Sequence, residues 1–131
     1  MTYFSDLSRY AYGPEEDARN VGWLDAHHDY PRGAIPPDAV TALRTTCVEL
    51  PVHRTRGWHQ CPFCGQVPVT VDHGGTPRPL GDAEIRVGEG ARRFAAPNLV
   101  IHYVAVHNYQ PPAEFVEALL DAPTSRDFEQ P

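Results

Sequence analysis

The sequence predicts a small α+β domain that is stabilised by zinc. Two cysteines, Cys61 and Cys64, are spaced as in a metal-binding loop, and two histidines, His102 and His107, follow farther along the chain. Apolar residues recur at helical spacing in some stretches and alternate with polar residues in others, so both helices and strands are expected. Proline accounts for 14 of the 131 residues, which favours short elements joined by loops.

The length of the chain indicates one domain with a modest core. We expect this domain to span residues 1–121 and residues 122–131 to form a flexible polar tail. The cysteine count is three, which argues against a disulfide framework and favours metal binding in a reducing compartment. Since the sequence has no long apolar run and no charged-then-apolar leader, we expect no membrane span and a cytoplasmic location.

The first part of the chain predicts an extended segment, a short strand and a helix. Residues 1–20 hold many aromatic side chains without helical periodicity, and residues 21–24 form the candidate strand. A helix over about 37–49 is predicted because Val40, Leu43 and Cys47 share one face and prolines stand at both ends. Cys47 is then a small buried apolar residue.

The middle of the chain predicts two hairpins. Residues 57–60 lead into the cysteine pair and residues 67–71 lead out of it, which indicates a first hairpin with the metal-binding knuckle at its tip. Residues 73–82 are rich in glycine and proline and are predicted to be a loop. Residues 83–87 alternate apolar and polar side chains, and residues 92–96 return as their partner strand in a second hairpin.

Two further helices are predicted in the last third. The segment 98–108 is apolar nearly all round, which is typical of a buried helix. A proline pair then starts a third helix over 113–120, about three helices in all. Its predicted inner face comprises Phe115, Val116, Leu119 and Leu120.

The pattern Cys61-Pro-Phe-Cys64-Gly65 carries the strongest chemical signal. Two intervening residues let both thiolates reach one ion, and Gly65 permits the positive φ that often follows such a loop. A redox cysteine pair would instead open a helix inside a βαβ unit, and the β pattern after Gly65 argues against that. The sequence therefore predicts a zinc knuckle.

His102 and His107 are predicted to complete a Cys2His2 site. They lie five positions apart, about 140° around an ideal helix, so the helix end must tighten or fray for both to reach one ion. The chief alternative ligand is His59, which precedes the knuckle, and His53 and His73 are more distant candidates. The sequence leaves open whether His59 replaces one of the helix histidines.

The motifs give little support for an enzyme. A catalytic zinc needs an open coordination position and a nearby general base, and His59 and Glu84 are the only residues we can place in such a role. The sequence contains no zinc-protease, deaminase, phosphate-loop or nucleophile-elbow motif. A zinc-dependent hydrolase-like enzyme is therefore the alternative, and no catalytic residue is assigned.

The charge balance argues against a nucleic-acid partner. The formal net charge is −6, and all 11 cationic residues are arginines. The 37 residues between Cys64 and His102 also far exceed the roughly 12 of a DNA-reading zinc finger. Binding of nucleic acid through the arginines is thus the weakest reading.

Several segments together resemble a family of small uncharacterised bacterial proteins, a domain of unknown function. These segments are residues 3–8, 21–24, 56–64, 83–87, 95–104, 107–109 and 111–115. The resemblance spans residues 2–120, implies a shared fold and supports Cys61, Cys64, His102 and His107 as the metal set. It implies no established activity.

Taken together, these observations predict a cytoplasmic zinc protein whose metal is structural. An acidic chain without a catalytic motif fits a binding or adaptor module, or an immunity-type module, that acts on an unknown protein partner.

Overall fold

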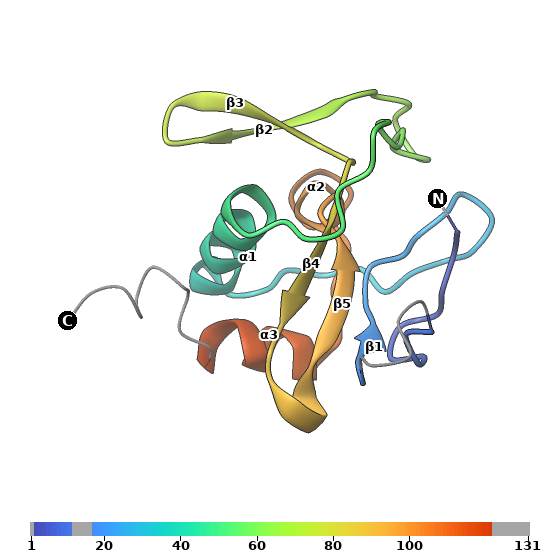
Figure 1. The fold of residues 1–131 in the computed structure, drawn as a ribbon, viewed down its shortest axis with the longest axis vertical. Coiled ribbons are helices and arrows are strands. Elements are labelled where there is room, and N and C mark those ends of the chain that lie inside the picture. Colours follow the sequence, from blue (N-terminus) through green and yellow to red (C-terminus); the bar gives the residue numbers. More distant parts are fainter. Residues whose placement is uncertain (1, 12–16, 122–131) are drawn as a thin grey trace.

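The computed structural model describes residues 2–11 and 17–121, so the tail predicted at 122–131 lies outside the described part of the chain. The protein has the predicted α+β architecture, with helices packed around two small sheets (Figure 1). Three α-helices are present in the described residues: α1 (Pro37–Glu49), α2 (Val100–Val106) and α3 (Ala113–Asp121).

The larger sheet has three strands in the order β1-β5-β4. The short strand β1 (Arg19–Asn20) runs parallel to β5 (Phe94–Pro97), and β4 (Glu84–Val87) runs antiparallel to it. The second sheet is a hairpin of β2 (Val69–His73) and β3 (Thr76–Leu80). The larger sheet therefore joins segments that are distant in sequence, with the first strand beside the last, whereas the second sheet is local.

Helix α1 confirms the predicted element over 37–49. Leu43 and Cys47 are buried on its inner face, which packs against α2 and α3. Cys47 is 1% exposed, and its burial raises the pKa of its thiol to about 12. Cys47 is therefore an apolar core residue, as the helical spacing indicated.

The prediction of a hairpin with the knuckle at its tip is wrong. Residues 57–60 form no strand, and β2 pairs instead with β3, across a turn at Gly74 and Gly75. The prediction of a loop over 73–82 fails for the same reason. Pro77 and Pro79 are tolerated in β3 because a two-stranded sheet has only edge strands, where a missing N–H need not face a partner.

The strand predicted at 21–24 is also displaced, since β1 ends at Asn20. The N–H of Val21 still donates to the carbonyl of Ala95 at 3.0 Å, but Gly22 then turns away with φ +78°. A Cβ at this glycine would lie 2.6 Å from Cγ2 of Val100, so the chain passes directly over the first residue of α2. Close packing against α2 thus ends the strand.

The second predicted hairpin is confirmed as β4 and β5, with a short 3-10 helix (Gly90–Arg92) in the connection. The helix predicted at 98–108 is shorter, and it is not buried on all sides, because Val106 is 61% exposed. The inner face of α3 differs in one position from the prediction. Phe115 and Leu119 are buried, whereas Leu120 is exposed.

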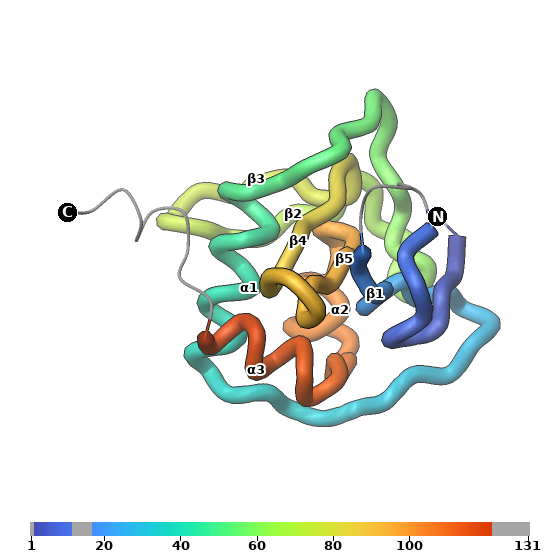
Figure 2. Tube along the Cα trace, turned by 60° about the horizontal axis from the view of Figure 1, so that its bottom comes forward, coloured from blue at the N-terminus to red at the C-terminus, as the bar shows by residue number. Residues whose placement is uncertain are grey.

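Besides a small cluster of Tyr10, Ala18, Trp23 and Ala95, the buried apolar residues form one large core. Its largest buried side chains come from all three helices and both sheets: Leu43, Leu80, Ile85, Phe94, Leu99, Ile101, Tyr103, Tyr109 and Phe115. The connection 25–36 runs outside this core to reach α1 and passes along the side that carries α3 (Figure 2). The knuckle and α2 therefore meet at one end of the core, and the chain around 31–36 meets α3 at another.

Candidate metal centre

The knuckle is shaped by its own backbone. The N–H of Cys61 donates to the carbonyl of Gln66 at 3.0 Å, and the N–H of Gly65 donates to the carbonyl of Cys61 at 3.0 Å. Gly65 takes φ +76°, the left-handed conformation that the sequence pattern requires. The N–H groups of Phe63 and Cys64 hydrogen-bond to the sulfur of Cys61. The loop thus turns both sulfurs toward one point.

The histidine pair comes from α2 and the residue that caps it. His102 lies in the first turn, where its N–H bonds the carbonyl three residues back, as in a tightened helix. His107 lies just beyond the helix with φ −109°, and the chain turns sharply at Asn108, which has φ +58°. The helix end therefore departs from ideal geometry in the way that a shared ion demands.

The structure brings together all four predicted site residues. The Sγ of Cys61 lies 3.4 Å from Nε2 of His107, and the Sγ of Cys64 lies 3.5 Å from Nε2 of His102. The two Nε2 atoms are 3.2 Å apart, and all four ligand atoms lie within 4.8 Å of one another. Of the Cys, His, Asp and Glu residues in the described part of the chain, only these form such a group, which can hold a metal ion.

Aromatic rings pack around this group. Phe63, in the middle of the knuckle, has its ring centroid 5.2 Å from that of His107 and 5.8 Å from that of Tyr103. Tyr30 lies 5.2 Å from Phe63 and donates its hydroxyl to the backbone carbonyl of His107 at 2.7 Å. Sequence spacing could not identify Tyr30, because it stands 77 residues before His107.

Burial shifts the pKa of three of the four side chains. It lowers the pKa of His102, which the neighbouring His107 lowers further, and it also lowers the pKa of His107. Both effects favour the neutral imidazole, the form that binds a metal. Burial raises the pKa of Cys61, while the N–H groups of the knuckle act against that rise. A cation would therefore be needed to hold a thiolate there.

The alternative histidines lie elsewhere. His73 places its Nε2 2.7 Å from a carboxylate oxygen of Glu49. His53 and His59 both line a small cavity of about 50 Å³, and none of the four clustered residues lines it. The group of four thus contains neither His59 nor the other two candidates.

Glu84, the other residue considered for proton transfer, lines that same small cavity. Its side chain is only 19% exposed. Its carboxylate accepts a hydrogen bond from the hydroxyl of Tyr10 at 2.9 Å and pairs with Arg86 at 2.9 Å. Glu84 therefore has two partners within the fold, which hold its carboxylate in place.

A polar network fixes the chain on its way into the knuckle. The N–H of His59 donates to the carbonyl of Gly81, and the N–H of Gly81 donates to the side-chain oxygen of buried Asn98 at 2.9 Å. Gly81 has φ +105°, and a Cβ there would lie 2.8 Å from the carbonyl oxygen of His59. This contact was not foreseen, and the glycine-rich composition of 73–82 was its only sequence signal.

The fold and the cluster together define a small α+β domain with a Cys2His2 group that can hold a metal ion. The sequence model of one protein family, the Domain of unknown function (DUF7919), matches residues 2–120, so the chain belongs to that family. No curated protein and no solved structure matches the chain. No helix among the described residues is long and apolar enough to cross a membrane.

Proposed function

We propose that this protein is a small zinc-binding protein in which the metal is structural and joins the knuckle to α2. The observation that carries the proposal is the convergence of two sulfurs and two Nε2 atoms within 4.8 Å. The ligands come from two segments that are far apart in sequence, so one ion coordinated by all four side chains would hold the two segments together.

The spacing of the ligand atoms supports zinc. With Zn–S near 2.3 Å and Zn–N near 2.05 Å, a tetrahedral shell places sulfur and nitrogen about 3.5 Å apart and the two nitrogens about 3.3 Å apart. The observed values are 3.4 and 3.5 Å for two of the four sulfur–nitrogen pairs and 3.2 Å for the nitrogen pair, and all four atoms lie within 4.8 Å of one another. Two thiolates with two imidazoles in a tetrahedral arrangement are typical of zinc.

The ligand count favours a structural metal over a catalytic one. Catalytic zinc keeps one position for water or substrate, whereas four protein ligands fill a tetrahedral shell. His59 and Glu84 line a separate small cavity and are not in the cluster. The hydrolase-like alternative therefore lacks both an open position and an adjacent base.

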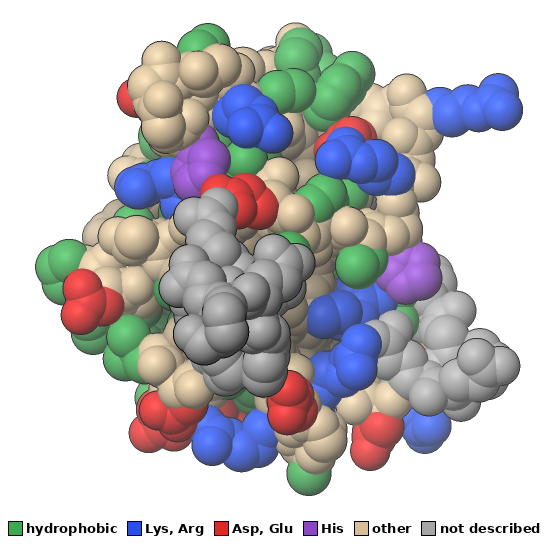
Figure 3. All heavy atoms as spheres, turned by 60° about the vertical axis from the view of Figure 1, so that its left-hand side comes forward, with side chains coloured by type: hydrophobic (Ala, Val, Ile, Leu, Met, Phe, Trp, Pro, Cys, Tyr) green, Lys and Arg blue, Asp and Glu red, His purple; other side chains and the backbone are tan. Residues whose placement is uncertain are grey.

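The acidic charge of the chain supports a binding or adaptor module, or an immunity-type module, that acts on a protein in the cytoplasm. The net charge of −6 suits a basic partner, because opposite charge raises the rate of encounter. On the face seen in Figure 3, arginine side chains are interspersed with acidic and neutral groups and form no continuous stripe. That pattern is a poor match for a phosphate backbone.

Zinc-edge X-ray absorption on protein purified without chelators tests this proposal, together with native mass spectrometry. We expect one zinc per chain, with a shell of two sulfurs and two nitrogens and no oxygen. A shell of three protein ligands and one oxygen would favour the hydrolase-like alternative instead. Protein that is folded but does not bind zinc would overturn the proposal.

A further inference from the structure

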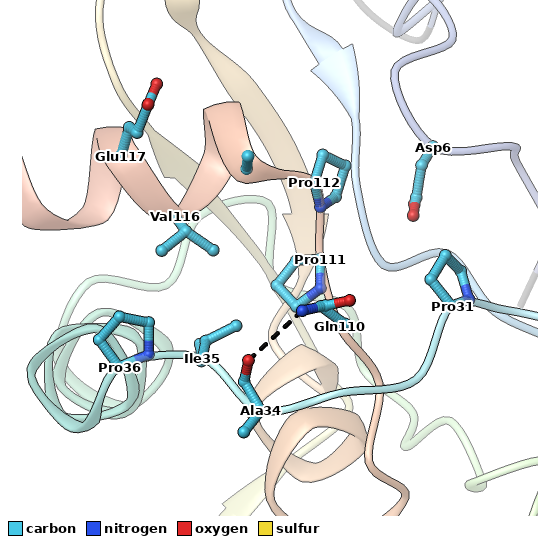
Figure 4. Close-up of a pocket in the computed structure, with 11 residues that line it drawn as sticks. Asp6, Pro31, Ala34, Ile35, Pro36, Gln110, Pro111, Pro112, Val116 and Glu117 are labelled. Carbon is cyan, nitrogen blue, oxygen red and sulfur yellow. Dashed lines mark hydrogen bonds between the residues drawn. The ribbon is translucent and has the colours of Figure 1, made fainter.

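A groove of about 540 Å³ lies at the start of α3 (Figure 4), and none of the four clustered residues lines it. The connection 31–36 forms one wall, and the chain from Gln110 into α3 forms the other. Ile35 and Val116 contribute apolar side chains between the walls. The volume lies within the range of roughly 300–1,000 Å³ that is typical of ligand-binding pockets.

The walls of this groove are rigid. Four prolines, two on each side, have fixed φ angles: Pro31, Pro36, Pro111 and Pro112. The walls are also tied together, because the N–H of Gly33 donates to the carbonyl of Asn108 at 3.0 Å and the N–H of Gln110 donates to the carbonyl of Pro31 at 2.9 Å. A preformed site of this kind loses little conformational entropy when it binds a ligand.

The groove carries negative charge. Asp6 and Glu117 lie on opposite sides of the proline and isoleucine side chains in Figure 4, and no arginine is among the residues that line the groove. Glu117 has one distant ion pair, 3.7 Å from Arg92, and both of these side chains are more than half exposed. Such a pair is weak and leaves most of the negative field in place.

Asp6 is the better anchor for a cation, because its carboxylate is held in place. One of its oxygens accepts the N–H of Gly22 at 3.0 Å, and the other accepts the hydroxyl of Tyr109 at 2.7 Å. A carboxylate has about four acceptor positions, so it can take further hydrogen bonds from a bound group. An arginine side chain presents a planar fork of donors that suits this geometry.

We propose that this groove binds a short extended segment of a partner protein, in which a basic side chain reaches Asp6 and an apolar neighbour packs on Ile35 and Val116. An apolar floor between two carboxylates suits alternate apolar and basic residues on one chain. The inference rests on the proposed function as a binding module. It also has a structural link to the metal cluster, since Gln110 follows the ligand His107 by three residues.

The test uses the full zinc-loaded chain and three fluorescein-labelled pentapeptides of valine and alanine that differ only in their central residue. That residue is arginine, its neutral analogue citrulline, or glutamate. We expect fluorescence anisotropy to show the arginine peptide binding about tenfold or more tightly than the citrulline peptide, with the glutamate peptide weakest. In NMR spectra, the arginine peptide should shift the amide signals of Gly22, Gln110 and Val116.

Three variants assign the binding to the groove. Asp6→Asn keeps a hydrogen-bonding side chain and should abolish the preference for arginine over citrulline, whereas Asp72→Asn, an exposed aspartate on β2, should leave it unchanged. If Asp6→Asn does not fold, Ala113→Arg tests whether the peptide binds in the groove. It adds a cation at an exposed groove position and should lower affinity for the arginine peptide about tenfold or more.

Equal affinity for the arginine and citrulline peptides, or shifts confined to other residues, would overturn this inference. Binding of free arginine amide as tightly as the arginine peptide would also overturn it, because the groove would then take a small cation. Zinc content, measured on the same samples, separates this result from the proposed function. If zinc-loaded protein shows no preference among the peptides, only the proposal of peptide binding in the groove is contradicted. If folded protein without zinc still prefers the arginine peptide, only the proposal of a structural zinc is contradicted.

Discussion

The knuckle and the helical core are stabilised in different ways. In the core, side chains such as Leu43, Ile85 and Phe115 are fully buried and pack on one another. In the knuckle region, residues 58–68, Cys61 alone is buried and Phe63 is half-buried, while the others are exposed. Burial of apolar surface, the main source of folding free energy, is thus plentiful in one region and scarce in the other.

This difference indicates what a bound metal would contribute to the knuckle. A few backbone hydrogen bonds hold the shape of the knuckle, and each adds only about 1 kcal/mol to stability. Fixing the backbone of each residue costs about 1–2 kcal/mol of entropy, so the loop needs another source of free energy. Coordination of one ion by Cys61, Cys64, His102 and His107 would supply it.

The largest expected effect follows from removing a knuckle ligand. Cys61→Ala should abolish zinc binding and release the knuckle, because structural zinc contributes on the order of 10 kcal/mol in zinc-finger peptides. Mass spectrometry gives the zinc content, and thermal unfolding gives the stability. The matched control is Cys47→Ala, which removes a buried thiol from α1 and should keep one zinc per chain. Equal zinc content in the two variants would contradict the comparison.

A core truncation should show the opposite pattern. Leu43→Ala removes a fully buried side chain from α1 and should lower the free energy of unfolding by about 3 kcal/mol, while zinc content stays unchanged. Chemical denaturation with zinc in excess measures the loss. Leu120→Ala, at a leucine that is 48% exposed, should cost much less. Loss of zinc from folded Leu43→Ala protein would show that the two regions are not separable.

A smaller effect is expected where the chain enters the knuckle. Gly81→Ala forces a Cβ against the carbonyl of His59 at a positive φ, and we expect a loss of about 2 kcal/mol in the free energy of unfolding. Gly57→Ala is the matched control, because a Cβ there meets no atom within 4 Å. If the denaturation curves of the two variants coincide, the lack of a side chain at Gly81 does not contribute to stability.

The smallest effect is expected for the aromatic rings that pack around the metal cluster. Tyr30→Phe keeps the ring against Phe63 but removes the hydrogen bond to the carbonyl of His107, which should cost about 1 kcal/mol. Transfer of zinc to a competing chelator should also become faster. Tyr3→Phe, at a ring that stacks on His28, should change neither quantity. If both variants behave alike, the hydroxyl of Tyr30 does not support the site.

The sequence predicted the parts of the structure that depend on local pattern. The helical stripe of α1, the alternation in β4 and the short spacing of the knuckle cysteines all act over a few residues, and all were found in the structure. The meeting of His102 and His107 with the knuckle was also predicted, because two thiolates leave two ligand positions of a tetrahedral zinc shell to be filled.

The sequence could not give what depends on contacts between distant segments. One local element was also missed: β3, which pairs with the adjacent β2, because the prolines Pro77 and Pro79 favour a loop in sequence and are accepted here in an edge strand. The end of β1 depends on the close approach of Gly22 to Val100, which local pattern does not encode. The groove beside α3 was missed for a similar reason, since its walls come from residues 31–36 and 110–117.

Hydrogen–deuterium exchange with and without a zinc chelator tests the central claim most directly. If the metal is a structural clamp, chelation should abolish protection of the Cys61 and Gly65 amides, which are hydrogen-bonded within the knuckle. Amides of β4 and β5 should keep more of their protection, because the apolar core supports them. Unchanged protection of the knuckle after complete removal of zinc would contradict the claim.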